Sequence, residues 1–106
     1  MAFIVEWTRT ATLDLEAIVN YIAEDDIGTA VSILSRLEEA AAALVRLPSR
    51  GRIVLELADY GIQTYRELVS SPWRIIYRIA GKKVIVLAVL DSRRNLEDLL
   101  LERLIR

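Results

Sequence analysis

The stretch Thr64–Ile79, T-Y-R-E-L-V-S-S-P-W-R-I-I-Y-R-I, contains two runs in which apolar and polar residues alternate. The runs flank Ser70-Ser71-Pro72, and these residue types favour turns. Alternation with a period of two on both sides of a turn predicts a β-hairpin with one buried face. On the second run this apolar face carries Trp73, Ile75, Tyr77 and Ile79.

The loop length sets which residues of the hairpin face each other. If the loop spans Ser70–Pro72, Leu68 pairs with Arg74 and Arg66 with Ile76. This register predicts that Arg66, Arg74 and Arg78 stand on one side of the sheet, whereas a two-residue loop would break that grouping. Because like charges on neighbouring strands repel, we expect such a cluster to face water or an anionic partner.

The residues before the hairpin predict a strand and two helices. Phe3–Trp7 is rich in strand formers, and Thr8 is a candidate N-cap for a helix that ends near Ala23. A second apolar stripe at helical spacing predicts a helix over Thr29–Leu47. The short acidic turn between the two predicts an antiparallel helical hairpin.

The remaining chain predicts a small sheet and a last helix. Ile53–Leu57 is expected to form a short turn or strand. Lys83–Leu90 is apolar on both faces and is predicted to be a central strand covered on both sides. Leu96–Arg106 is predicted to be a helix, with Asn95 and Asp98 forming its capping box.

The predicted order is therefore β-αα-βββ-α, an α+β fold in which an antiparallel sheet packs against a helical hairpin. The first strand is expected at an edge of the sheet. We expect the helices to cover the face of Trp73, Ile75, Tyr77 and Ile79. The arginine face is expected to stay open or to be covered by a partner.

Composition limits the function. The 106 residues predict one domain, 1–106, and a net charge of -1 lacks the overall basic character of a nucleic-acid binder. With no Cys and no His, thiolate chemistry and the commonest general base are absent. No signal peptide is recognised and apolar runs are shorter than the ~18 residues needed to span a bilayer, which predicts a cytoplasmic protein without membrane contact.

A hydrophobic fraction of 54% is high for so small a domain, and we expect an exposed apolar patch for a protein partner. The alternative is that Ala and Leu in helices raise this fraction. The acidic run Glu24-Asp25-Asp26 is interpreted as a solvated turn. We predict no metal site and no cofactor.

Arginines are the one residue type whose positions suggest a binding or catalytic site. Arg50 and Arg52 precede the sheet, and others lie on the hairpin or after the central strand. The planar guanidinium suits phosphates and carboxylates. The alternative is ordinary ion pairing with Glu56, Glu67 or Asp91.

The sequence resembles the ParE/RelE superfamily of bacterial toxins from type II toxin–antitoxin modules. The resemblance extends along nearly the whole chain. It is carried by L-D-L-E-A-I-V-N-Y-I-A with its acidic turn, L-P-S-R-G-R, Y-R-E-L-V, W-R-I-I-Y-R-I and V-I-V-L-A-V-L-D-S-R-R. It implies a RelE/ParE-like fold and a cytoplasmic toxin. It also implies a cognate antitoxin, ParD-like or similar, that wraps the toxin and carries the contact to operator DNA.

Two branches of this superfamily differ in target. The RelE-like branch cleaves mRNA on the ribosome, and Arg66, Arg74 and Arg93 match its basic residues by position. Leu68, Asp91 and Leu99 depart from that pattern, since relatives there carry a second basic residue, a His and a Tyr. The ParE-like branch inhibits DNA gyrase and has no known chemistry of its own.

We therefore predict a ParE-like gyrase inhibitor that acts by protein–protein binding rather than as an enzyme. The alternatives are a RelE-like ribosome-dependent mRNA endoribonuclease using Arg66, Arg74 and Arg93, and a non-toxic antitoxin-binding module. The residues predicted to contact the target or the antitoxin are Arg52, Arg66, Arg74, Arg78, Arg93 and Arg94.

Overall fold

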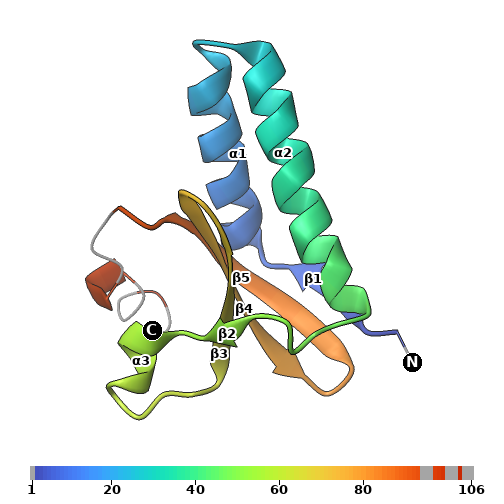
Figure 1. Cartoon of the computed structure of the whole chain (residues 1–106), viewed down its shortest axis with the longest axis vertical. Helices are drawn as coiled ribbons and strands as arrows, with labels where there is room; N and C mark the ends of the chain where they lie inside the picture. The colour runs from blue at the N-terminus through green and yellow to red at the C-terminus, as the bar shows by residue number, and fades with distance from the viewer. Residues whose placement is uncertain (1, 94–96, 100–102, 104–106) are drawn as a thin grey trace.

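Two long helices stand on one side of a small sheet, and a short helix lies on the other side (Figure 1). The computed structural model describes residues 2–93, 97–99 and 103. The elements in chain order are β1 (Ile4–Trp7), α1 (Arg9–Ala23), α2 (Ile27–Ala42), the 3-10 turn η1 (Ala43–Val45), β2 (Arg52–Ile53), α3 (Leu55–Ala58), β3 (Tyr65–Ser70), β4 (Trp73–Ala80) and β5 (Lys83–Asp91). The predicted α+β class is confirmed.

Each long helix begins at a side-chain cap. Thr8 accepts a hydrogen bond from the backbone nitrogen of Ala11 at 3.1 Å, as predicted for the start of α1. Asp26 does the same for Thr29 at 3.2 Å, and this backbone hydrogen bond lowers the pKa of Asp26. The cap starts α2 at Ile27, two residues before the predicted Thr29.

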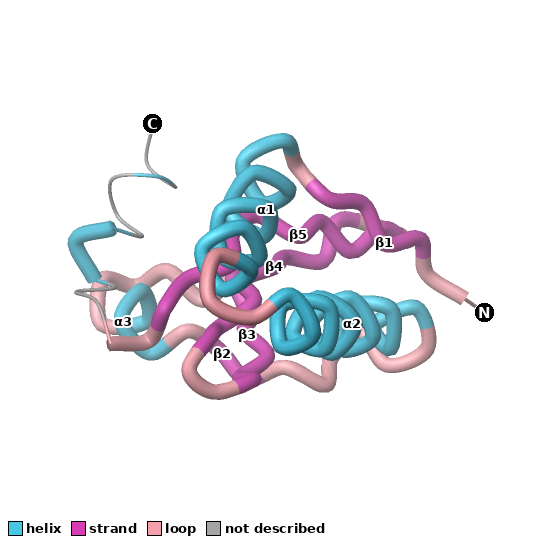
Figure 2. Tube along the Cα trace, turned by 90° about the horizontal axis from the view of Figure 1, so that it is seen from above, coloured by secondary structure: helices cyan, strands magenta, loops and turns pink. Residues whose placement is uncertain are grey.

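The sheet has five strands in the order β1-β5-β4-β3-β2. The pairs β5–β4, β4–β3 and β3–β2 are antiparallel, and β1 joins the edge beside β5 in parallel. The predicted central strand and edge strand are thus confirmed. Figure 2 shows from above how α1 and α2 lie over this sheet.

The predicted hairpin register was wrong by one residue. Ser70 pairs with Trp73, so the loop is only Ser71-Pro72, and Leu68 lies opposite Ile75. The predicted register would have placed Glu67 opposite Ile75, under the helices. The observed register instead places Leu68 there, where it packs against the main core, and this apolar burial favours it.

Two apolar clusters hold the layers together. The cluster under α1 and α2 includes Leu15, Leu37, Ile75 and Tyr77, which confirms the predicted helix-covered face. The second cluster lies on the opposite face of the sheet and consists of Val54, Leu57, Ile76, Ala88 and Leu90.

The expectation of an open arginine face was therefore wrong, because α3 and the segment around it cover much of that side. The segment Ile53–Leu57, expected to be a short turn or strand, contains the last residue of β2 and the first three residues of α3.

A bulge in β5 allows this strand to contribute side chains to both apolar clusters. Ile76 pairs with Ala88 and Tyr77 with Val86, so Leu87 has no partner residue in β4. After this extra residue the alternation changes phase: Val84, Val86 and Val89 pack in the first cluster, and Ala88 and Leu90 in the second.

The predicted last helix and its Asn95 cap lie largely outside the described residues. Its described parts, Glu97–Leu99 and Arg103, are helical. Leu99 packs against the second cluster, and Arg103 forms an ion pair with Asp14 of α1 at 2.7 Å.

Candidate functional site

The observed register separates the predicted arginine cluster. Arg66 pairs with Tyr77 and shares the face that α1 and α2 cover, whereas Arg74 and Arg78 project to the opposite face. The prediction that all three stand on one side was wrong, because it assumed a three-residue loop.

A charge network of Arg52, Glu56, Glu67 and Arg74 occupies this opposite face. Arg74 is held between two carboxylates: its terminal nitrogens donate to Glu56 at 2.7 and 2.8 Å, and it also pairs with Glu67. The side chains of Arg74 and Glu67 are only 8% and 1% exposed. The Nε atom of Arg52 donates to Glu67 at 2.7 Å, which brings a second cation to the buried carboxylate. The network thus balances its own charge.

The network also changes proton affinities. Hydrogen bonds from Arg74 hold the pKa of Glu56 below its ordinary value, and those to Glu56 raise the pKa of Arg74. Both groups are thus held in their charged forms. Arg74 has little surface left for an external phosphate, and Glu56 stays ionised rather than available as an acid.

Arg66 serves the backbone of the Pro48–Arg52 loop. Its guanidinium donates to the carbonyl oxygen of Gly51 at 2.7 Å. The Tyr77 hydroxyl donates to the Pro48 carbonyl at 2.7 Å and accepts the Gly51 N–H at 2.9 Å. These bonds fix the loop from which Arg50 and Arg52 project.

The other predicted arginines are more accessible. Arg52 has a side chain that is 62% exposed despite its bond to Glu67. Arg93 is 74% exposed and forms an ion pair with Asp91 at 2.6 Å, which raises its pKa. Arg78 is partly exposed and makes no ion pair within the described residues. Arg94 lies outside the described residues.

The positions that depart from the nuclease pattern have structural contacts. Leu68 packs against the first apolar cluster and Leu99 against the second. Asp91 accepts hydrogen bonds from Arg93. In residues 2–93, 97–99 and 103, no group of three or more His, Cys, Asp or Glu is placed to hold a metal ion.

An apolar groove lies between the helical hairpin and the ends of β4 and β5. It encloses about 640 Å³ and is lined by Ile18, Tyr21, Ile22, Ile33, Pro72 and Trp73 among others. Tyr21 is 75% exposed, and the nearby Ile27 and Val31 are also exposed. Arg36 lies over the ring of Trp73, with its guanidinium carbon 5.8 Å from the ring centre. This groove is the kind of exposed apolar surface that the composition predicts.

A protein-family model described as "ParE toxin of type II toxin-antitoxin system, parDE" matches residues 5–96. The chain belongs to this ParE toxin family. Its membership confirms the resemblance stated from the sequence. In the described part of the chain, no helix has the length and apolar character required to cross a membrane.

Curated relatives bear names from both branches of the superfamily. The chain is 31% identical to Toxin ParE3 of Caulobacter vibrioides over 90 residues, covering 84% of this chain and 86% of that toxin. It is 34% identical to Toxin RelE2 of the same organism over 91 residues, covering 85% and 96%. The names alone therefore do not choose between the two activities.

Solved structures support the ParE/RelE fold. A chain from the chromosomal ParDE toxin–antitoxin system of P. aeruginosa matches with a TM-score of 0.69 and 22% identity, covering 85% of this chain and 96% of that chain. A chain of the toxin–antitoxin complex RelBE2 from Mycobacterium tuberculosis matches with a TM-score of 0.62 and 24% identity, covering 86% and 99%.

Sequence reasoning missed the polar groups that organise this ParE-family site. The sequence predicts at most a surface ion pair for Glu67, yet Glu67 is buried and binds two arginines. The alternation predicts a core position for Tyr77, but its hydroxyl also forms hydrogen bonds that hold the loop. With the two-residue loop, the alternative to the predicted register, Glu67 falls on the same face as Arg74. That alternative register was the available signal for this pair.

Proposed function

We propose that this ParE-family toxin acts by binding DNA gyrase and inhibiting it, and that a cognate antitoxin neutralises it. The observation that supports protein binding rather than catalysis is the position of Arg74. Its guanidinium is enclosed by Glu56 and Glu67, so its charge is already compensated. A nuclease centre would need free cations near the scissile phosphate and a group to move protons.

The antitoxin proposal draws on the apolar groove and on the structural relatives. Both solved relatives belong to toxin–antitoxin systems. An exposed groove that contains Tyr21 and Trp73 suits a segment that folds as it binds. We assign contact with operator DNA to the antitoxin, because this chain has a net charge of -1.

We retain Arg52, Arg78 and Arg93 as candidate contact residues for the target or the antitoxin. Their guanidinium groups are at least partly accessible. Arg94 is proposed with them from its place in the sequence. Arg66 and Arg74 are proposed to act indirectly, by holding the loop and the charge network.

A supercoiling assay tests this function. Purified toxin should block gyrase supercoiling or trap cleaved DNA, and the antitoxin should reverse the effect. Arg93→Ala should weaken inhibition, whereas Arg9→Ala removes an equal charge at the exposed start of α1 and should not. Absence of any effect on gyrase, together with cleavage of ribosome-bound mRNA, would contradict the proposal.

The second candidate is a ribosome-dependent mRNA endoribonuclease, favoured by the similarity to Toxin RelE2. In that case Arg93→Ala should abolish message cleavage in a translation-coupled assay while the protein stays folded. The third candidate, a non-toxic antitoxin-binding module, predicts normal growth when the chain is induced alone. Growth arrest would exclude it.

A further inference from the structure

The outer edge of β3 is longer than the strand that covers it. β3 spans Tyr65–Ser70, but β2 pairs only with Arg66 and Glu67. The next backbone contact, from the nitrogen of Val54 to the oxygen of Tyr65, extends the pairing away from the hairpin loop. The residues Leu68–Ser70, which we call the open edge, have no strand neighbour on this side among the described residues.

The backbone of Val69 points out of the open edge. In an antiparallel sheet, successive residues direct their N–H and C=O groups to alternate sides. Tyr65 directs its carbonyl toward β2, so Glu67 and Val69 face the same way. Glu67 is opposite Arg52, but Val69 lies beyond the end of β2. Its donor and acceptor are therefore presented at the edge.

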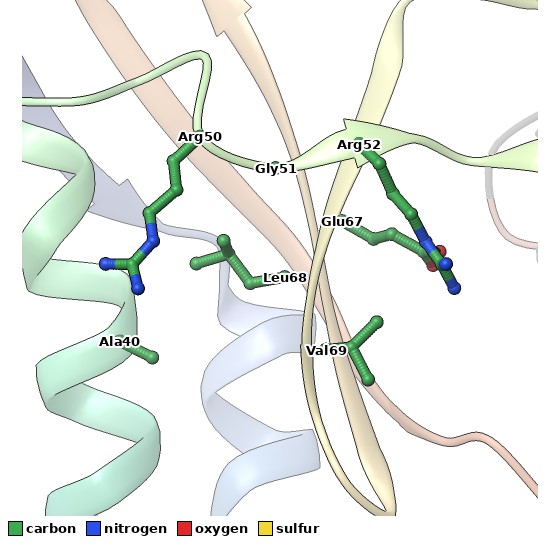
Figure 3. Close-up of a pocket in the computed structure, with 7 residues that line it drawn as sticks. All are labelled: Ala40, Arg50, Gly51, Arg52, Glu67, Leu68 and Val69. Carbon is green, nitrogen blue, oxygen red and sulfur yellow. The ribbon is translucent and has the colours of Figure 1, made fainter.

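The open edge borders a hollow of about 380 Å³ (Figure 3). Figure 3 shows Arg50 on one side of β3, with Ala40 and Leu68 near its side chain. Arg52 lies on the other side, near Val69. The Val69 residue is 50% exposed. An added strand would thus meet apolar and cationic groups on both of its faces.

The arginines beside the open edge favour the binding of a negatively charged segment. Arg50 is exposed and has no ion pair within the described residues, and Arg52 is 62% exposed. Arg36 donates to the carbonyl of Ser71, just beyond the edge. The carboxylate in this region, Glu67, is already bound by Arg52 and Arg74. Arg50 therefore leaves an uncompensated positive charge beside the edge, and Arg52 presents an exposed guanidinium there.

Other occupants fit less well. A second copy of the chain, paired edge to edge, would bring the same arginines together, and their like charges would repel. A nucleic-acid phosphate could meet Arg50 or Arg52, but it offers no N–H donor to the Val69 carbonyl. An extended acidic peptide satisfies both the backbone and the charges.

We propose that the open edge of β3 is a docking site where an extended, acidic segment of a partner protein adds as a further strand. Adjacent acidic residues of this segment would point to opposite faces and reach Arg50 and Arg52. Flanking apolar residues would cover Leu68 and Val69. The assignment of this segment to the antitoxin rests on the proposed function, but the binding itself needs neither antitoxin nor gyrase.

A peptide titration tests the site directly. The probe is acetyl-Thr-Val-Glu-Glu-Val-Thr-amide, followed by nuclear magnetic resonance on the isotope-labelled full chain. We expect saturable shifts centred on the Val69 amide and slower hydrogen exchange there. The same peptide with Lys in place of both Glu should bind about tenfold more weakly. A peptide methylated at both Glu nitrogens should also lose about tenfold, because one of these nitrogens faces the edge.

Protein variants give the reciprocal test. Val69→Pro removes the outward N–H at a position where an edge strand tolerates proline, and it should weaken binding about tenfold. Val69→Thr keeps the N–H and should bind within about twofold of the wild type. Arg50→Glu should weaken binding roughly threefold or more, while Arg9→Glu makes the same charge change away from the edge and should have no effect.

The outcomes separate pairing from charge attraction. Equal binding of the methylated and unmethylated peptides would overturn the proposal, because it would show that charge alone attracts the probe. No shift at Val69 with millimolar peptide would also overturn it. Either result would leave gyrase inhibition unaffected, and a toxin inactive on gyrase would leave a positive peptide result standing.

Discussion

The phenolic oxygen of Tyr77 lies 2.9 Å from the backbone nitrogen of Gly51, 26 residues earlier in the chain. The same hydroxyl donates to the Pro48 carbonyl, so one buried side chain satisfies two loop groups. Burial raises the pKa of Tyr77, which keeps the hydroxyl protonated at neutral pH. The loop that carries Arg50 and Arg52 is thereby attached to the centre of the sheet.

Tyr77→Phe should destabilise the fold by about 1–3 kcal/mol, because it leaves the Gly51 N–H and the Pro48 carbonyl without their partner. Urea unfolding at pH 7 measures the loss. Tyr65→Phe is the matched control, since the Tyr65 hydroxyl makes no hydrogen bond within the described residues. Similar losses in both variants would contradict the assigned role.

Gly51→Ala should also be destabilising, by about 1–3 kcal/mol, because of overpacking. A Cβ atom at this position would lie 2.5 Å from the Tyr77 hydroxyl and 2.6 Å from the Glu67 carbonyl oxygen, a backbone atom that cannot move freely. Gly28→Ala is the comparison. There the nearest atom is a side-chain oxygen of Asp26 at 3.3 Å, and α2 gains helix propensity. Thermal unfolding should rank Gly51→Ala as the less stable variant.

Arg74→Met should cost about 3–5 kcal/mol, because it leaves the buried Glu67 with only the more exposed Arg52. Arg78→Met is the control on the same strand, where no described carboxylate forms an ion pair with the arginine. Chemical unfolding should show a clear loss in the first variant and little change in the second. If Arg74→Met unfolds like the wild type yet is not toxic, Arg74 contacts the target instead.

The main elements could be predicted from local sequence patterns. Period-two alternation identified β3 and β4, the continuous apolar run identified β5, and Thr8 marked the start of α1. These signals are local, because a helix cap and the alternation along a strand each involve residues that are only a few positions apart in the sequence. The ordered set of motifs was also sufficient to recognise the family.

The side-chain partners could not be predicted, because they depend on one residue of loop length. With Ser71-Pro72 as the loop, Glu67 and Arg74 fall on the same face. A longer loop would have buried Glu67 under the helices. The helix that covers this face, α3, could not be predicted either. It spans only Leu55–Ala58, and four residues carry little helical periodicity.

Glu56→Gln should show how the contribution of the charge network to stability depends on pH. Arg74 holds the pKa of Glu56 below its ordinary value of 4.5. The stabilisation from the ionised carboxylate is therefore complete above pH 4.5, and it is lost as the pH falls through the lowered pKa of the folded state. Urea unfolding should show the wild type to be more stable than Glu56→Gln at pH 7, and the difference should shrink as the pH falls below about 4.5.

Glu38→Gln removes an exposed carboxylate without an ion pair in the described residues and should match the wild type at pH 7. A gap between the wild type and Glu56→Gln that widens in acid would contradict the assignment, since protonation makes Glu56 resemble the Gln that replaces it.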